Sequence, residues 1–253
     1  MAGITSHRFD VTKLVGSLGV PDGSMAVDER VRDIVDDFLL ALDQMYEVVY
    51  YHHAVRAANW GLTATFKRAL AIAEEEGAGS VFPLGEAEPF WRLAAEGGAV
   101  PLDVYGQLDE SSAWTHVHRW TDHRDATLKD LAGRLEERRL LKTVQLPKQN
   151  IEESVHARDL ARASVSESCP ALQPEYYARI DEPSRVSYKR YKANEGAGDA
   201  IRLVGRDGRV VPIEDDPRSI ADFLARAKQF HPRLIVHPDA RDTVRRKLNG
   251  GNR

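Results

Sequence analysis

The pattern of apolar and polar positions predicts that the first half of the chain is helical. Between residues 29 and 42, apolar side chains recur at helical spacing and acidic ones alternate with them. An amphipathic helix is therefore expected, with Asp33, Asp36 and Asp37 directed outward. Residues 43–73 contain no proline and one glycine, and carry apolar side chains around most of the helix circumference. This pattern predicts one long buried helix on which the other helices pack.

Two further helices are expected between residues 109 and 146. One begins after Asp109, a good N-cap, and ends near residues 123–125. The next follows Leu128 and its apolar repeats as far as Leu140. Its C-terminal end is basic, with Arg134, Arg138, Arg139 and Lys142. Cations at a helix C-terminus interact favourably with the helix dipole, and we favour this interpretation over the alternative, a phosphate contact.

The periodicity changes in the last third of the chain. Strands are expected near residues 176–180, 201–204 and 233–236, and a hairpin turn at 206–209. Helices are expected at 219–228 and 239–248. The predicted fold class is mainly α with a small α+β C-terminal subdomain. The predicted domains are a helical region, residues 1–146; a linker with one helix at 151–163, residues 147–174; and the α+β subdomain, residues 175–253.

Composition narrows the range of partners. The 253 residues have a formal net charge of −4, so a nucleic acid partner is disfavoured. Residues 188–192 alternate aromatic and basic side chains, which we interpret as an exposed strand edge. The single cysteine, Cys169, excludes an internal disulfide and favours a reducing compartment. No apolar run has the length of a membrane span, so a cytoplasmic location without a membrane partner is expected.

One polar stripe lies in the predicted long helix. His52, Arg56 and Asn59 are spaced i, i+4 and i+7, which places them on one face. A cationic stripe in a buried helix requires an anion, either a ligand or an acidic residue of a neighbouring element, unless it is a solvated edge. Spacing alone leaves these alternatives open.

Three histidines, at positions 116, 118 and 123, suggest a metal site, but we reject this hypothesis. Side chains at i and i+2 point to different sides of a helix, and no carboxylate or cysteine completes the set. Surface histidines beside two packing tryptophans are expected instead.

The run from Met45 to Ala58, MYEVVYYHHAVRAA, resembles the helix "YE-x-VY-[FY]-HK-x-x-RAAE" of HD-domain phosphohydrolases related to deoxynucleoside triphosphate triphosphohydrolases. The segment Gly3-Ile4 with FDVTKLV at 9–15 is similar to the segment after that family's last metal-ligand helix. Residues 125–142 are similar to its "DP-x-L-x-DL-x-x-x-L-x-x-RRL-[FL]-K" element. The resemblance spans roughly residues 1–146 and implies a helical HD-phosphohydrolase-like bundle.

The resemblance also implies a chemistry, the hydrolysis of a dNTP to nucleoside and triphosphate by metal-bound water. His52 and Arg56 would line the phosphate side, with Trp60 near the sugar. His53 replaces the family's usual Lys, and Asn59 its usual Glu. In regulated members the residues that correspond to Arg138 and Lys142 help to bind an activating nucleotide between subunits.

The family's metal ligands are a His, a His-Asp pair and a later Asp. No histidine of this sequence is followed directly by aspartate; Asp122-His123 has the reverse order. We therefore assign no catalytic residue and no metal ligand, and expect that the chain alone binds no metal and is inactive. Complete family members are expected to hold Mg, Mn or Fe.

Three hypotheses about the chain's role follow. It is the C-terminal portion of such an enzyme, present as a shortened copy. Alternatively, it is a partner subunit that completes an HD site supplied by another chain. Finally, it is a non-catalytic protein for nucleotide binding or oligomerisation. A dNTP is the expected small-molecule partner, and either a homo-oligomer or a chain with the HD motif is the expected protein partner.

Overall fold

Contacts divide the chain into two compact units, each built from two separate segments. The computed structural model describes residues 9–21, 23–146, 151–186, 201–226, 228–230 and 232–250. The first unit comprises Met1–His52 and Glu182–His231, and the second comprises His53–Asp181 and Pro232–Arg253. The prediction of a mainly helical chain with a smaller α+β part is confirmed. Whether residues 1–146, 147–174 and 175–253 act as separate domains stays a prediction.

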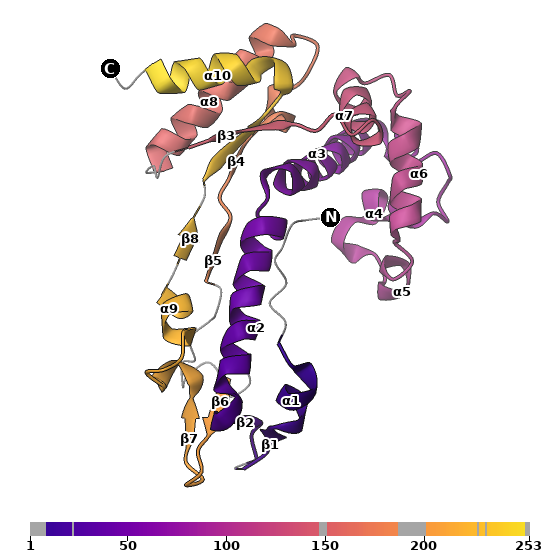
Figure 1. Cartoon of the computed structure of the whole chain (residues 1–253). Coiled ribbons are helices and arrows are strands. Elements are labelled where there is room, and N and C mark those ends of the chain that lie inside the picture. Colours follow the sequence, from indigo (N-terminus) through magenta and orange to yellow (C-terminus); the bar gives the residue numbers. More distant parts are fainter. Residues whose placement is uncertain are drawn as a thin grey trace. The chain divides into compact units, whose positions relative to one another are not determined.

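The first unit combines short helices with a small mixed sheet (Figure 1). Its helices are α1 (Val11–Gly16), α2 (Arg32–Met45) and α9 (Ala221–Arg226), with 3-10 turns at Glu29–Val31 and Ile213–Asp215. Its four-stranded sheet has the order β1 (Leu18–Gly19), β2 (Ala26–Asp28), β6 (Arg202–Val204), β7 (Val210–Pro212). β2 and β6 are parallel, and the other pairs are antiparallel. β5 (Ser184–Val186) pairs with β8 (Lys228–Phe230).

The core of the first unit lies between α2, the sheet and α9, and includes Val35, Leu39 and Leu203. Asp36 also lies here, with 8% exposure, so the expectation that it is directed outward is wrong. Its carboxylate accepts hydrogen bonds from Ser219 Oγ at 2.7 Å and from the backbone N–H of Ile220 at 3.3 Å. These donors precede α9, and a buried donor needs an acceptor.

The second unit contains most of the helices and a three-stranded sheet (Figure 1). Its helices are α3 (His53–Glu76), α4 (Pro89–Glu96), α5 (Leu102–Tyr105), α6 (Glu110–Trp120), α7 (Ala126–Glu136), α8 (Ile151–Ser168) and α10 (Pro238–Gly250). Its 3-10 turns are Ala78–Ser80, Gly97–Ala99 and Pro174–Tyr176. The sheet has the order β3 (Lys142–Gln145), β9 (Arg233–Val236), β4 (Ala178–Asp181), with both pairs antiparallel.

β9 is the central strand of this sheet, and all four of its residues are buried. α8 and α10 pack against each other, α8 contacts β4 and β9, and α10 contacts β3, as Figure 1 shows. One apolar cluster joins this layer to the first half of α3 through Trp60 and Ala64. A second cluster joins the second half of α3, including Ile72, to α4, α6 and α7. α3 therefore takes part in both clusters, as expected for the central helix.

The predicted continuous helix over 43–73 is interrupted. α2 ends at Met45, a π-helical segment follows at Tyr46–Tyr50, and α3 begins at His53. The N–H of Tyr51 bonds to the carbonyl of Tyr46 at 2.8 Å, an i to i−5 bond. Aromatic and β-branched residues, which lose rotamer freedom in helices, crowd this segment. Local propensity therefore overrides the apolar pattern here.

Two other predicted boundaries are wrong. α7 ends at Glu136, so Leu140 lies outside the helix. The basic residues Arg138, Arg139 and Lys142 also lie outside it. α8 continues to Ser168 through part of the predicted linker. Ser164 is accommodated because its hydroxyl donates to Leu160 O at 2.9 Å.

Other elements are confirmed: α6 with its Asp109 cap, the β6–β7 hairpin, β9 and α10. Gly3-Ile4 and the aromatic-basic stretch at 188–192 lie outside the described residues. Within the described part of the chain, no helix combines the length and the apolar character needed to cross a membrane.

Candidate functional site

A cavity of about 1090 Å³ in the second unit is lined by cationic side chains. We call it the cationic pocket. Its lining includes one carboxylate, that of Asp239, and the histidine His53. Its cationic residues are Arg134, Arg138, Arg139, Lys142, Arg241 and Arg245. This excess of positive charge in one cavity suits a multiply charged anion.

Three parts of the chain supply these cations. Arg134 lies in the last turn of α7, and Arg138 and Arg139 follow that helix. Lys142 begins β3 and pairs with Val236, the last residue of β9. α10 begins two residues after Val236, so the β3–β9 register brings Lys142 close to the start of the helix that carries the other arginines, at positions 241 and 245. These last two are four residues apart, and so share one helix face.

The C-terminal end of α7 has the geometry of a Schellman motif. The N–H of Arg139 bonds to Arg134 O at 2.9 Å, and the N–H of Arg138 bonds to Leu135 O at 3.2 Å. Arg138 has a φ of 54°, in the left-handed region, where glycine is favoured. It is the one non-glycine residue with a positive φ in the described part of the chain. An arginine is thus kept at a position where it costs backbone energy.

Most of the pocket cations lack a carboxylate partner. Arg134 pairs with Asp130 at 2.7 Å, and Arg139 pairs with Glu137. The structure shows no ion pair among described residues for the remaining four, Arg138, Lys142, Arg241 and Arg245. The Nε atom of Arg241 is buried and has no hydrogen-bond partner among the described residues. Unsatisfied buried donors are costly, and an anionic ligand would satisfy this one.

Arg56, from the predicted polar stripe, has a protein partner. Its Nε donates to both oxygens of Asp181, at 3.0 and 3.1 Å, and its Nη2 also contacts that carboxylate. Asp181 is 4% exposed and lies 3.8 Å from Arg233, whose pKa is lowered by burial. Of the alternatives left open by the sequence, Arg56 thus has an acidic residue of a neighbouring element as its partner. A phosphate role for Arg56 stays a prediction.

The other predicted stripe residues lie in different environments. Trp60 is buried, donates from Nε1 to Tyr176 O at 3.0 Å, and has the Arg179 guanidinium 4.4 Å from its ring centroid. His53 lines the cationic pocket. His52 and Asn59 are exposed. The structure thus brings together His53, Arg138 and Lys142, but it does not bring Trp60 to this pocket.

A chain of polar contacts runs from the core to the edge of the pocket. Tyr177 Oη donates to Asp130 Oδ2 at 2.7 Å, and Asp130 pairs with Arg134. The guanidinium of Arg134 contacts Nε2 of His237, which is 1% exposed. Burial, followed by the charge of Arg134, lowers the pKa of His237, so its imidazole is neutral at pH 7.

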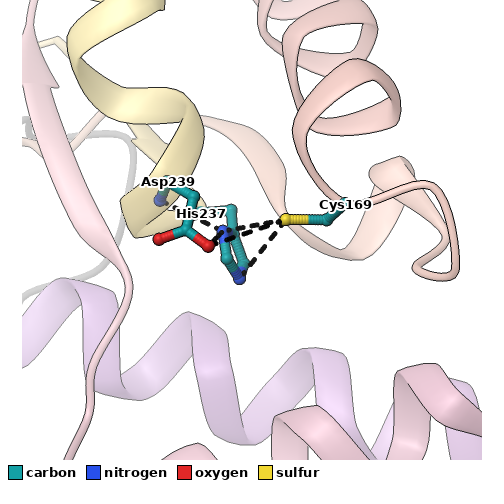
Figure 2. Close-up of side chains that lie close together, drawn as sticks. All are labelled: Cys169, His237 and Asp239. Carbon is teal, nitrogen blue, oxygen red and sulfur yellow. Dashed lines mark hydrogen bonds and ion pairs between the residues drawn. The ribbon is translucent and has the colours of Figure 1, made fainter.

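Cys169 and Asp239 complete a cluster with His237. Figure 2 shows the three side chains pointing toward one another. Cys169 Sγ lies 3.4 Å from His237 Nδ1, and burial raises the pKa of its thiol. Within the part of the chain that the structure describes, this is the group of three side chains whose donor atoms are close enough to hold a metal ion.

Two of the three histidines from the rejected metal hypothesis lie in different environments. His116 is fully buried, 3.1 Å from Glu88 Oε1, among Phe82, Phe90 and Trp120. The expectation of a surface histidine is wrong there, because the aromatic core of α4 and α6 encloses the ring. His118 is exposed.

The fold is shared with solved protein structures. A crystal structure of a phosphohydrolase from Bacteroides thetaiotaomicron matches with a TM-score of 0.70 and 20% identity, over 93% of this chain and 57% of that one. A hypothetical protein from Aquifex aeolicus matches with a TM-score of 0.55 and 18% identity, over 97% of this chain and 53% of that one.

The sequence also has a curated relative. It is 25% identical over 97% of its length to the uncharacterized protein YwfO of Bacillus subtilis, and covers 57% of that protein. The chain thus spans little more than half the length of these relatives. No protein family description matches it.

Sequence reasoning missed several residues of this site. Arg241 and Arg245 resemble ordinary surface charges on an amphipathic helix, and they are about a hundred residues from Arg138. Their i, i+4 spacing was the available signal. Cys169 and His237 are 68 residues apart, and the packing of α8 against β9 and α10 brings their segments together.

Proposed function

We propose that this chain is the phosphate-binding portion of an HD-type dNTP phosphohydrolase, and that the cationic pocket binds a nucleoside triphosphate through its polyphosphate. The observation that carries the proposal is the group of four pocket cations without carboxylate partners among the described residues. The fold shared with a phosphohydrolase supports the reaction class. The resemblance of residues 125–142 supports a nucleotide at Arg138 and Lys142.

Each guanidinium or ammonium group would donate charge-assisted hydrogen bonds to phosphate oxygens. The arginine forks suit two oxygens at once, whereas Lys142 acts as a point charge. Asp239, the one carboxylate in the lining, would lie away from the phosphates because like charges repel. A bound polyphosphate would offset the repulsion among the pocket cations. Salt screens this electrostatic gain, so affinity would fall steeply as the salt concentration rises.

Catalysis needs groups beyond this pocket. Hydrolysis at phosphorus requires a metal-bound water, and the family supplies the ion through its His-Asp pair, which has no counterpart in this sequence. We therefore propose that the chain binds dNTP but does not hydrolyse it alone. His52 and Arg56 would line the catalytic phosphate side when the metal-bearing part is present.

The binding test is a calorimetric titration of the purified chain with dATP and with inorganic triphosphate. Arg138→Ala and Lys142→Ala should each weaken binding about tenfold or more, since a charge-assisted hydrogen bond contributes about 1.5–3 kcal/mol. Lys129→Ala is the matched control, because Lys129 is an exposed cation on α7 outside the pocket. Equal affinity in all three variants would refute the pocket assignment.

The hydrolysis test uses dNTPs with Mg²⁺, Mn²⁺ or Fe²⁺. We expect no release of triphosphate by the chain above that of a His52→Ala/Arg56→Ala variant. Turnover above this variant would show that the chain is an enzyme by itself. Addition of a polypeptide with the His-Asp motif should restore turnover if the chain completes a site in a second subunit.

A second function, nucleotide sensing without catalysis, is favoured by one observation. The cationic pocket belongs entirely to the second unit and contains no metal-ligand set of the HD type among its lining residues. If sensing is the role, dATP would change the oligomeric state of the chain in sedimentation experiments. Arg138→Ala would abolish that change, and no HD partner would restore hydrolysis.

A further inference from the structure

The cluster of Cys169, His237 and Asp239 is assembled by three different elements. Cys169 follows the last residue of α8, and its N–H bonds to Val165 O at 2.8 Å. His237 joins β9 to α10, and its N–H bonds to Tyr177 O at 3.1 Å. Asp239 lies in the first turn of α10. Helix ends and a strand pairing therefore hold the backbones of all three residues in place.

The donor atoms are spaced slightly more widely than in a tetrahedral metal site. Sγ lies 3.4 Å from His237 Nδ1 and 4.0 Å from Asp239 Oδ2, and Nδ1 lies 3.8 Å from Oδ2. Zinc bonds of about 2.3 Å to sulfur and about 2.0–2.1 Å to nitrogen and oxygen correspond to donor separations of about 3.3–3.6 Å. Small side-chain adjustments would therefore suffice to enclose an ion.

The donor types select the class of ion. Thiolate is a soft ligand and imidazole an intermediate one, whereas Mg²⁺ and Ca²⁺ prefer oxygen ligands. We propose that Cys169, His237 and Asp239 form a binding site for a thiophilic divalent transition-metal ion, with Zn²⁺ the best fit. Three protein ligands leave the fourth position to water. The site is distinct from the catalytic ion that the family resemblance implies for complete enzymes.

Ordinary helix capping explains only part of this geometry. An acidic side chain in the first turn of α10 is favourable to the helix dipole, and the Asp239 N–H bonds to His237 Nδ1 at 3.2 Å. These facts account for Asp239 and the imidazole orientation. They give no reason for a thiol directed at both, at a 4.0 Å separation from Oδ2 that exceeds a good hydrogen bond.

Binding requires loss of the thiol proton, loss of the hydrogen bond from the Asp239 N–H to His237 Nδ1, and one side-chain movement. The thiol proton passes to solvent, and sulfur forms the bond to the metal. With Nδ1 bound to metal, the imidazole proton occupies Nε2, where Arg134 now makes contact. Nη2 of Arg134 must then leave Nε2, while its Nε keeps the 2.7 Å bond to Asp130. The Asp239 side chain is 71% exposed, so the ion enters from solvent.

This proposal departs from the expectation that the chain alone binds no metal, and it is tested on the full chain without nucleotide. Zn²⁺ affinity and stoichiometry are measured by competition with a chromophoric chelator. Substitution by Co²⁺ then reports the ligands, because a thiolate-to-cobalt charge-transfer band requires sulfur coordination. We expect one ion per chain and such a band.

The variants separate ligands from bystanders. Cys169→Ser and Asp239→Asn should each weaken Zn²⁺ binding more than about tenfold, since even second-shell partners of a metal contribute about 10–100-fold. His118→Gln, at an exposed position, should leave affinity unchanged. Cys169→Ser must also abolish the charge-transfer band.

Three results would overturn the proposal. They are Zn²⁺ binding at less than one ion per chain, unchanged affinity in both ligand variants, and a Co²⁺ spectrum without the sulfur band. The spectrum of the unsubstituted chain decides the matter even if a variant fails to fold.

Discussion

Two groups of arginines in the second unit differ in how their charge is balanced. Arg56 and Arg68 form hydrogen-bonded pairs with Asp181 and Asp125, and both pairs link elements distant in sequence. In the cationic pocket, Arg241 and three other cations have no such partner among the described residues. The number of arginines is therefore a poor guide to an anion site. The carboxylates around them distinguish a structural pair from a ligand site.

The two groups should respond differently to substitution. Removal of a buried pair's partner leaves an uncompensated charge and destabilises the fold. Removal of a pocket cation reduces like-charge repulsion, so the fold is unaffected or stabilised while ligand affinity falls. All four tryptophans lie in the second unit, so their fluorescence reports its unfolding selectively.

The largest expected effect concerns the paired group. Asp181→Ala removes the buried carboxylate that pairs with Arg56 and Arg233, and should lower the free energy of unfolding by about 3 kcal/mol. Urea unfolding followed by tryptophan fluorescence measures this change. Asp159→Ala removes the exposed partner of Arg158 on α8, and should cost less than about 0.5 kcal/mol. An equal loss of stability in the two variants would contradict a structural role for the buried pairs.

The next effect concerns the unpaired group. Arg241→Gln should weaken triphosphate binding about tenfold, the equivalent of about 1.4 kcal/mol. It should not lower stability, since the buried Nε of Arg241 has no partner among the described residues to lose. Arg246→Gln is the matched control on the same helix, outside the pocket lining. A loss of stability in Arg241→Gln would place that residue among the structural arginines.

A smaller effect separates backbone cost from ligand affinity at position 138. Arg138→Gly and Arg138→Ala both remove the side chain from the pocket, but only glycine relieves the left-handed backbone. The glycine variant should be about 1 kcal/mol more stable than the alanine variant. Calorimetry should show the same loss of triphosphate affinity in both. Unequal affinities would mean that the backbone, and not the guanidinium, contacts the ligand.

The last prediction concerns how the stability of the second unit changes with pH. Burial alone would raise the pKa of Asp125, but hydrogen bonds from Arg68 and the Leu128 N–H outweigh it and lower the pKa. Its contribution to stability is therefore complete above its unfolded pKa of about 3.9, and is lost as pH falls through the lower folded value. Asp125→Asn should flatten the decline of stability below about pH 5. Asp103→Asn, an exposed control on α5, should not.

Much of the fold could be predicted from local signals. The Asp109 cap, the hairpin turn near Gly208 and the apolar run of β9 each determine structure within a few residues. The predictions that failed depend on distant partners. Asp36 is buried because Ser219 and Ile220 need an acceptor, and no pattern within α2 indicates them.

The candidate site was predictable only in part, for the same reason. Arg138 and Lys142 belong to one contiguous stretch with a family resemblance, so they could be proposed together. Arg241 joins them through the β3–β9 register, which the sequence does not encode locally. The partner of Arg56 was equally hidden, since Asp181 is 125 residues away.

Arg134 and Asp239 line the cationic pocket and also contact His237. An ion held by the cluster would move Nη2 of Arg134 away from His237 and neutralise the carboxylate of Asp239, and both changes alter the potential that a polyphosphate meets. Thermodynamic reciprocity then requires that nucleotide change zinc affinity by the same factor as zinc changes nucleotide affinity. Two ligands that never touch would thus change each other's affinity through two side chains.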